Sequence, residues 1–231
     1  MENIISYYGK NFFELLSLFV AVVGIFIITS KKTKTKTEKS FFYYLLSYLS
    51  ISILALFNIV FNPKADILVL ALAQPLTDYL FTIFEFYIFS WILRPSIPKW
   101  IYEFGSLIFY TSCPILLYLG WPWHLKTNYF HLQFLYNIQA IILLVYTCFY
   151  FFSIFRSTSL YLINESIFWI NSGLTFFLIT TLPFTIISSY LLRSKTFVFF
   201  NLFNIIPVFY SVLFVFIIVG LKKEQIKSSM I

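Results

Sequence analysis

The sequence predicts an all-α integral membrane protein, a single bundle of seven transmembrane helices, and three observations lead to this prediction. Hydrophobic residues make up 60% of the 231 residues and charged residues only 11%, whereas soluble domains contain about 25% charged residues. Apolar runs of about 20 residues, the length that crosses a bilayer as a helix, recur along the chain. These runs are continuous, whereas a membrane β-barrel is built from short alternating segments.

Seven apolar runs are separated by charged or turn-forming residues. A Lys-Thr segment at 31–37 follows the first run. A cleavable signal has its positive charges before the apolar run, so this run is expected to be an uncleaved span. Asn-Pro-Lys at 62–64 ends the second run, and Pro95 and Pro98 lie in the turn after the third. The predicted spans are 12–30, 41–61, 67–93, 100–119, 129–155, 167–191 and 197–221.

The basic residues predict the orientation. With the N-terminus outside, the inner segments hold eleven of the 16 Lys and Arg residues, although Arg193 and Lys195 go against this trend. Cytoplasmic loops are enriched in Lys and Arg, so a cytoplasmic C-terminus and a multi-pass location in the cell inner membrane or plasma membrane are expected. The net charge of +7 then reflects topology and contact with the lipid bilayer, and no nucleic-acid partner is predicted.

The third run carries polar residues at membrane depth. Gln74, Asp78, Thr82 and Glu85 are spaced i, i+4, i+8 and i+11, so they fall within a sector of about 80° on one helix face. An ionisable side chain inside a membrane is costly, which makes it a candidate functional residue. Asp78 and Glu85 are about 10 Å apart along the axis, so they form a polar stripe rather than a pair sharing a proton.

Amides in the other runs fall near the depth of Asp78. We predict an outward-facing pocket among the third, fifth, sixth and seventh helices, and a relay of polar residues leading inward. No Lys or Arg lies deep in a span, so Asp78 is expected to hold a proton or to meet a cationic ligand. The alternative is a set of interhelical hydrogen bonds worth about 0.6 kcal/mol each. The predicted ligand-binding residues are Gln74, Asp78, Asn137, Asn201 and Asn204, and the predicted relay is Thr82, Glu85 and Asn171, with Asn171 and Ser172 beside Glu85.

Signals of enzyme or cofactor chemistry are sparse. The two histidines, His124 and His131, are too few for a multi-histidine metal site. There is no Gly-x-Ser-x-Gly elbow and no glycine-rich phosphate loop. Cys113 and Cys148 fall at different depths in their spans, which argues against a disulfide. The sequence therefore predicts no catalytic residue, no metal and no cofactor, and favours a role other than catalysis.

The sixth run opens with NESIFWINSG at 164–173. Its Phe-Trp-Ile followed by a small polar residue and Gly, together with the acidic third run, is similar to small uncharacterised seven-helix bacterial integral membrane proteins. Those proteins are related to the membrane sensing modules of histidine kinases. The resemblance implies a sensory, receptor-like module without a known ligand. The sequence ends at Ile231 without a kinase or effector domain, so a separate signalling partner protein is expected.

Three functions therefore stay open. The first is a receptor-like membrane sensory module that binds a small-molecule or cation ligand in the outward pocket and signals through a partner. The second is a small proton- or cation-coupled transporter that uses the stripe formed by Gln74, Asp78 and Glu85 as its path. The third is a membrane-embedded enzyme acting on lipids, in which Asp78 and Glu85 would work with His131.

Overall fold

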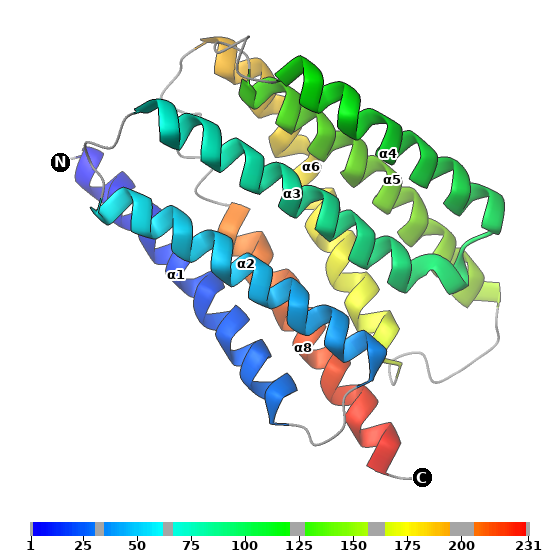
Figure 1. Cartoon of the computed structure of the whole chain (residues 1–231). Coiled ribbons are helices and arrows are strands. Elements are labelled where there is room, and N and C mark those ends of the chain that lie inside the picture. The colour runs from blue at the N-terminus through cyan, green and yellow to red at the C-terminus, as the bar shows by residue number, and fades with distance from the viewer. Residues whose placement is uncertain are drawn as a thin grey trace.

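The computed structural model of the chain describes residues 2–30, 35–61, 67–120, 128–156, 165–194 and 206–229 (Figure 1). Side chains are described within 14–30, 35–53, 77–119, 133–156, 165–187 and 206–223. In these parts of the chain there are seven α-helices, one short 3-10 helix and no strand. The elements are α1 (Glu2–Thr29), α2 (Lys36–Phe61), α3 (Ile67–Leu93), η1 (Arg94–Ser96), α4 (Lys99–Gly120), α5 (Asn128–Arg156), α6 (Ser166–Ser194) and α8 (Ile206–Ser229).

The helix bounds follow the predicted spans closely in the middle of the chain and differ at its ends. Helix α3 has the predicted bounds, and α4, α5 and α6 differ by at most three residues at either end. Helix α1 begins ten residues before the predicted span. Helix α8 continues past the predicted end at Leu221 to Ser229, while residues 197–205 lie outside the described residues. Hydropathy marks a membrane segment, but a helix continues until its backbone is capped, so the two bounds need not coincide.

The start of α2 shows how capping sets a bound. The backbone N–H of Thr35 donates to Glu38 Oε2 at 2.9 Å, and the N–H of Glu38 donates to Thr35 Oγ1 at 3.2 Å. This reciprocal pair is a capping box, which satisfies backbone donors at the first turn of a helix. Helix α2 therefore begins at Lys36, five residues before the apolar run.

Six of the helices form a closed ring. In the order α1, α2, α3, α5, α6 and α8, each helix packs on the next, and α8 returns to α1. Helix α4 lies outside this ring against α5 (Figure 1). The ring of Phe86 on α3 stacks on Phe109 of α4 with centroids 3.9 Å apart, and both side chains are fully buried. Because the six ring helices close on one another, their side chains surround one interior, and α4 packs outside it.

The closest helix contact in the ring is between α6 and α8, and two glycines allow it. A Cβ atom at Gly173 would overlap Phe216 of α8. A Cβ atom at Gly220 would lie 2.7 Å from the carbonyl oxygen of Ser166 and 2.9 Å from Ile170. Small residues at such crossings let helix backbones approach, which is common between helices in membranes.

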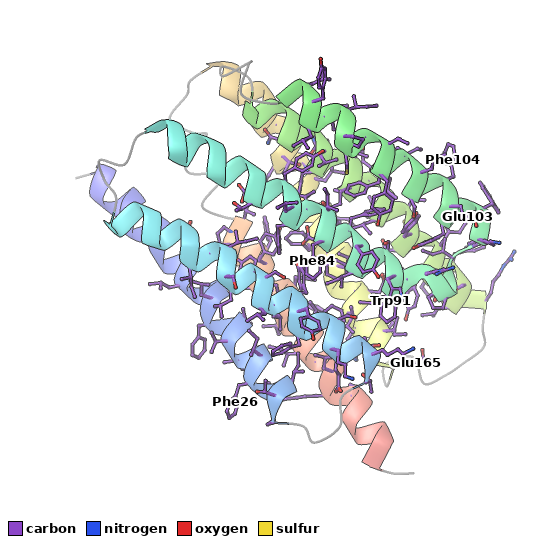
Figure 2. All side chains as sticks on the ribbon, in the orientation of Figure 1. Phe26, Phe84, Trp91, Glu103, Phe104 and Glu165 are labelled. Atoms are coloured by element: carbon purple, nitrogen blue, oxygen red, sulfur yellow. The ribbon has the colours of Figure 1, made fainter. Side chains whose placement is uncertain are left out.

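The outside of the bundle is apolar. Phe26 on α1 and Phe104 on α4 point away from the bundle (Figure 2) and are 72% and 61% exposed. Four helices contain described stretches long and apolar enough to cross a membrane, and α1 has a shorter apolar stretch at Glu14–Thr29. These features are those of a membrane protein. The four stretches are Lys99–Leu119, Gln133–Arg156, Ser166–Ile187 and Ile206–Lys223.

The exposed basic side chains that the structure describes lie at one end of the bundle, where α1, α3, α5 and α8 end and α2, α4 and α6 begin (Figure 1). We call this the basic end. Its exposed members are Lys36, Lys39, Arg94, Lys99, Arg156 and Lys222.

Candidate functional site around Glu85

Glu85 lies inside the helix ring and is only 2% exposed. The hydroxyl of Tyr44 on α2 donates to Glu85 Oε1 at 2.7 Å. The side-chain amide of Gln139 on α5 donates through Nε2 to Glu85 Oε2 at 2.9 Å. One carboxyl group on α3 thus joins its two neighbouring helices in the ring, and both of its oxygens accept a hydrogen bond.

Tyrosine side chains extend this arrangement to the rest of the ring. The hydroxyl of Tyr48 on α2 donates to Ser17 Oγ on α1 at 2.9 Å. Tyr136 on α5 donates to Thr181 Oγ1 on α6 at 3.3 Å, and Tyr136 is close enough to Glu85 for electrostatic interaction. Tyr210 on α8 packs on Tyr48 with ring centroids 5.1 Å apart.

Each of the six ring helices therefore contributes at least one polar side chain to a common interior cluster. We call this cluster the Glu85 network. Its members are Ser17, Tyr44, Tyr48, Glu85, Tyr136, Gln139, Thr181 and Tyr210.

The charge of Glu85 has no basic partner among the described residues. Lys99 and Glu103 form an ion pair at 3.7 Å, which lies on the surface of α4 and not beside Glu85. Burying an ionised carboxyl without a counter-charge costs several kcal/mol. Glu85 is therefore a place where a proton or a small cation would be stabilised.

Gln139 adds a second oxygen beside the carboxyl group. Its Oε1 atom is buried and has no hydrogen-bond partner in the described part of the chain. A buried acceptor left unpaired costs about 1–3 kcal/mol, so it would be satisfied by a donor or a cation. Hard cations prefer oxygen ligands of the carboxylate and amide type. The described residues hold no cluster of three or more His, Cys, Asp or Glu side chains suited to a metal ion, so the chemistry available here is that of a proton or a weakly held cation.

A second polar layer joins α5 and α6 on the side of Glu85 away from the basic end. The hydroxyl of Thr185 donates to Asn137 Oδ1 at 2.6 Å, and Gln133 Nε2 donates to the backbone carbonyl of Thr185 at 2.8 Å. Asp78 on α3 is half-buried, and among the described residues no hydrogen bond reaches its carboxyl group. This layer contains one of the predicted pocket residues, Asn137, which bonds to α6 and makes no hydrogen bond to Asp78.

The other predicted pocket residues cannot be placed. The side chain of Gln74 and the residues Asn201 and Asn204 lie outside the described part of the chain. The histidines His124 and His131 also lie outside the described side chains, so the trio of His131 with the two acids stays a prediction.

The relay residues are buried. Thr82 is 5% exposed and donates to the carbonyl of Asp78 at 2.8 Å. The hydrogen-bond partners of Glu85 are Tyr44 and Gln139. The expected place of Asn171 and Ser172 beside Glu85 stays a prediction.

Asn171 lies on α6, ten residues before Thr181 of the Glu85 network and nearer to the basic end, where α6 begins. It is 1% exposed, and neither polar atom of its side chain has a hydrogen-bond partner among the described residues.

Several members of the network were not predicted from the sequence. The predicted site residues include none of Tyr44, Tyr48, Tyr210 and Gln139. One signal was available. Tyr44 and Tyr48 are spaced i and i+4, which places two hydroxyl groups on one face of α2.

Comparison with known proteins found no matching family model, no similar curated protein and no similar solved structure.

Proposed function

We propose that this chain is a receptor-like membrane sensory module that detects a proton or a small cation at Glu85. In this proposal all seven apolar segments cross an inner or plasma membrane, the N-terminus lies outside, and the basic end faces the cytoplasm. The observation that carries the proposal is the Glu85 network. A buried carboxyl group on α3 accepts hydrogen bonds from α2 and α5, within an interior cluster to which every ring helix contributes a polar side chain.

A change of charge at Glu85 would alter the contacts between helices. As a carboxylate, Glu85 accepts hydrogen bonds from both Tyr44 and Gln139. As a protonated acid, one of its oxygens becomes a donor and needs an acceptor. The unpaired Oε1 of Gln139 supplies that acceptor when its amide group rotates. Proton uptake is then coupled to a rearrangement at the contact between α3 and α5.

The output would leave at the basic end. Exposed lysines and arginines there come from α2, η1, α4, α5 and α8, so a shift of α3 against α5 changes the spacing of positive charges on one surface. A separate partner protein with an acidic surface would respond to that spacing.

Difference infrared spectroscopy of the full chain in lipid vesicles tests the sensor. A pH jump or a sodium jump should change a carboxylic-acid C=O band, and Glu85→Gln should remove that change. Glu103→Gln is the matched control, because its carboxyl group is exposed on α4 and 61% accessible. If Glu85→Gln keeps the wild-type difference spectrum, Glu85 does not exchange a proton or cation and the proposal fails.

A proton- or cation-coupled carrier is the second candidate, and Asn171 is the observation that favours it. Its unpaired amide is buried on α6, nearer to the basic end than Thr181 of the Glu85 network, where a further polar step of a path would be needed. Vesicles containing a trapped pH dye separate the two functions. A carrier gives proton flux that both Glu85→Gln and Asn171→Leu abolish, whereas a sensor gives the infrared response without flux.

A further inference from the structure

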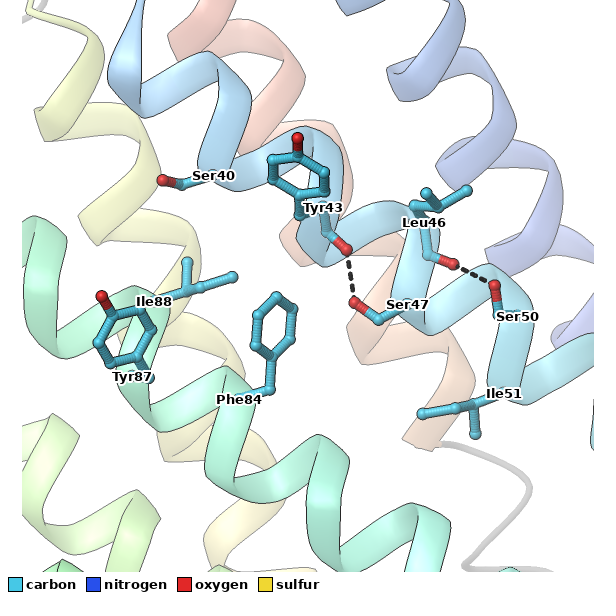
Figure 3. Close-up of a pocket in the computed structure, with 9 residues that line it drawn as sticks. All are labelled: Ser40, Tyr43, Leu46, Ser47, Ser50, Ile51, Phe84, Tyr87 and Ile88. Atoms are coloured by element: carbon cyan, nitrogen blue, oxygen red, sulfur yellow. Dashed lines mark hydrogen bonds between the residues drawn. The ribbon is translucent and has the colours of Figure 1, made fainter.

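A groove of about 540 Å³ runs along the outside of the bundle between α2 and α3 (Figure 3). It is separate from the Glu85 network, which lies inside the ring. Tyr43 and Tyr87 stand at its rim and are 58% and 56% exposed. Its lining consists of Ser40, Tyr43, Leu46, Ser47, Ser50, Ile51, Phe84, Tyr87 and Ile88.

Three small serine side chains leave space for the groove, and their hydroxyl groups do not make its surface polar. Each hydroxyl donates to a carbonyl oxygen one turn earlier in α2: Ser40 to Lys36 at 3.1 Å, Ser50 to Leu46 at 2.8 Å, and Ser47 to Tyr43 (Figure 3). A serine bonded in this way has little capacity left for a ligand. The groove therefore offers space beside small side chains and an apolar surface, which suits a hydrocarbon chain better than a polar molecule.

The length and position of the groove match one leaflet of a bilayer. Ser40 and Ile51 are eleven residues apart on α2, or about 16 Å, and half of the hydrocarbon core is about 15 Å. The groove ends one turn from the basic end. Lys36 lies on the same face of α2 as Ser40, and Lys39 is also exposed there. Three more lysines, at 31, 32 and 34, precede them in the sequence, against a single acid, Glu38.

We propose that this groove seats one acyl chain of an anionic phospholipid whose phosphate lies against Lys36 and Lys39. The apolar lining selects the chain, and the lysines select the charge of the headgroup. A helix from a second copy fits less well, because packed helices need axes 8–10 Å apart and the tyrosines at the rim would hold it away. The proposal does not rest on Glu85 or on the proposed sensor.

Native mass spectrometry of the full chain tests the proposal. The protein is taken from vesicles with equal amounts of phosphatidylglycerol and phosphatidylcholine, and the lipids that stay bound are counted. Wild type should keep phosphatidylglycerol preferentially. A double change, Lys36→Gln with Lys39→Gln, should lower that preference at least fivefold, since each lysine near a phosphate contributes a factor of about five.

A second test fills the groove with a larger side chain. Ser47→Phe, or Ser50→Phe if the first variant folds poorly, should lose the bound lipid of either headgroup. Thr111→Phe is the matched control, because Thr111 is also an exposed helix position whose hydroxyl donates to a carbonyl one turn earlier, at 2.7 Å. Equal lipid retention by Ser47→Phe, Ser50→Phe and Thr111→Phe would overturn the proposal and leave annular lipid only. A dimer that Ser47→Phe converts to a monomer would overturn it in favour of a second copy.

Discussion

Tyr44→Phe removes one hydroxyl group from the Glu85 network and little else. The aromatic ring of residue 44 is kept. Its contacts with Phe81 and Phe89, at centroid distances of 5.7 and 5.3 Å, should therefore persist. The lost interaction is the 2.7 Å hydrogen bond to Glu85, which is buried at both ends. Hydrogen bonds between membrane helices average about 0.6 kcal/mol and reach about 1.7, whereas a bond to an ionised group is worth about 1.5–3.

The free energy of unfolding, measured in detergent micelles by titration with a denaturing detergent, should therefore fall by about 1–2 kcal/mol in Tyr44→Phe. Tyr43→Phe is the control. Tyr43 is exposed at the preceding position of α2, and its change should stay within about 0.5 kcal/mol.

A double-mutant cycle with Glu85→Leu, which removes both acceptor oxygens, then isolates the pair. A coupling energy near 0.6 kcal/mol would correspond to a neutral acid, and one near 2 kcal/mol to a carboxylate. If the coupling is zero, or if Tyr44→Phe behaves like Tyr43→Phe, the hydrogen bond does not hold α2 to α3 and the network loses its centre.

Three further changes test the fold and the interior. Gly173→Ala puts a methyl group into Phe216 where α6 meets α8, so the unfolding free energy should fall by about 1–3 kcal/mol in the same detergent titration. Thr35→Ala removes the capping hydroxyl that accepts from Glu38, so a loss of about 0.5–2 kcal/mol is expected, with lower helicity by circular dichroism. Asn171→Leu replaces an unpaired buried amide by an apolar side chain, so it should raise the unfolding free energy by about 1–3 kcal/mol. It should also abolish any proton flux. A loss of stability would show that the amide has partners.

The helices were predictable because membrane segments have a distinctive amino-acid composition. Continuous apolar runs require helices in a bilayer, and turn residues separate them. The bounds of 67–93 agree with those of α3 because a turn signal lies on each side of that run, at 62–64 before it and at Pro95 after it. The start of α2 could have been read from Thr35 and Glu38, which form a capping box in the sequence. Hydropathy alone could not show it, because the first turn of α2 is polar.

The shared face of the α3 residues was also predictable, since 100° per residue fixes which side chains point together. Thr82 and Glu85 are both buried in the ring, whereas Asp78 is half-buried. The helix partners were not predictable. Ring order depends on which helices pack, and a single sequence does not state that α3 lies between α2 and α5 while α4 lies outside. The helix neighbours are therefore what identifies Glu85, rather than Asp78, as the centre of the candidate site.

Stability alone does not require an acid at the centre of this ring. Tyr44 and Gln139 give Glu85 two hydrogen bonds, and at about 0.6 kcal/mol each in a membrane they recover little of the several kcal/mol lost on burying a charge. Apolar side chains of similar volume in place of Glu85, Tyr44 and Gln139 together would fill the same space, and such a replacement of a whole buried polar group is often neutral or stabilising. The same reasoning applies to Asn171, which has no hydrogen-bond partner in the described residues. These polar groups are therefore costly to the fold, and we expect variants that replace them by apolar side chains to stabilise the bundle while removing the proton or cation response proposed above.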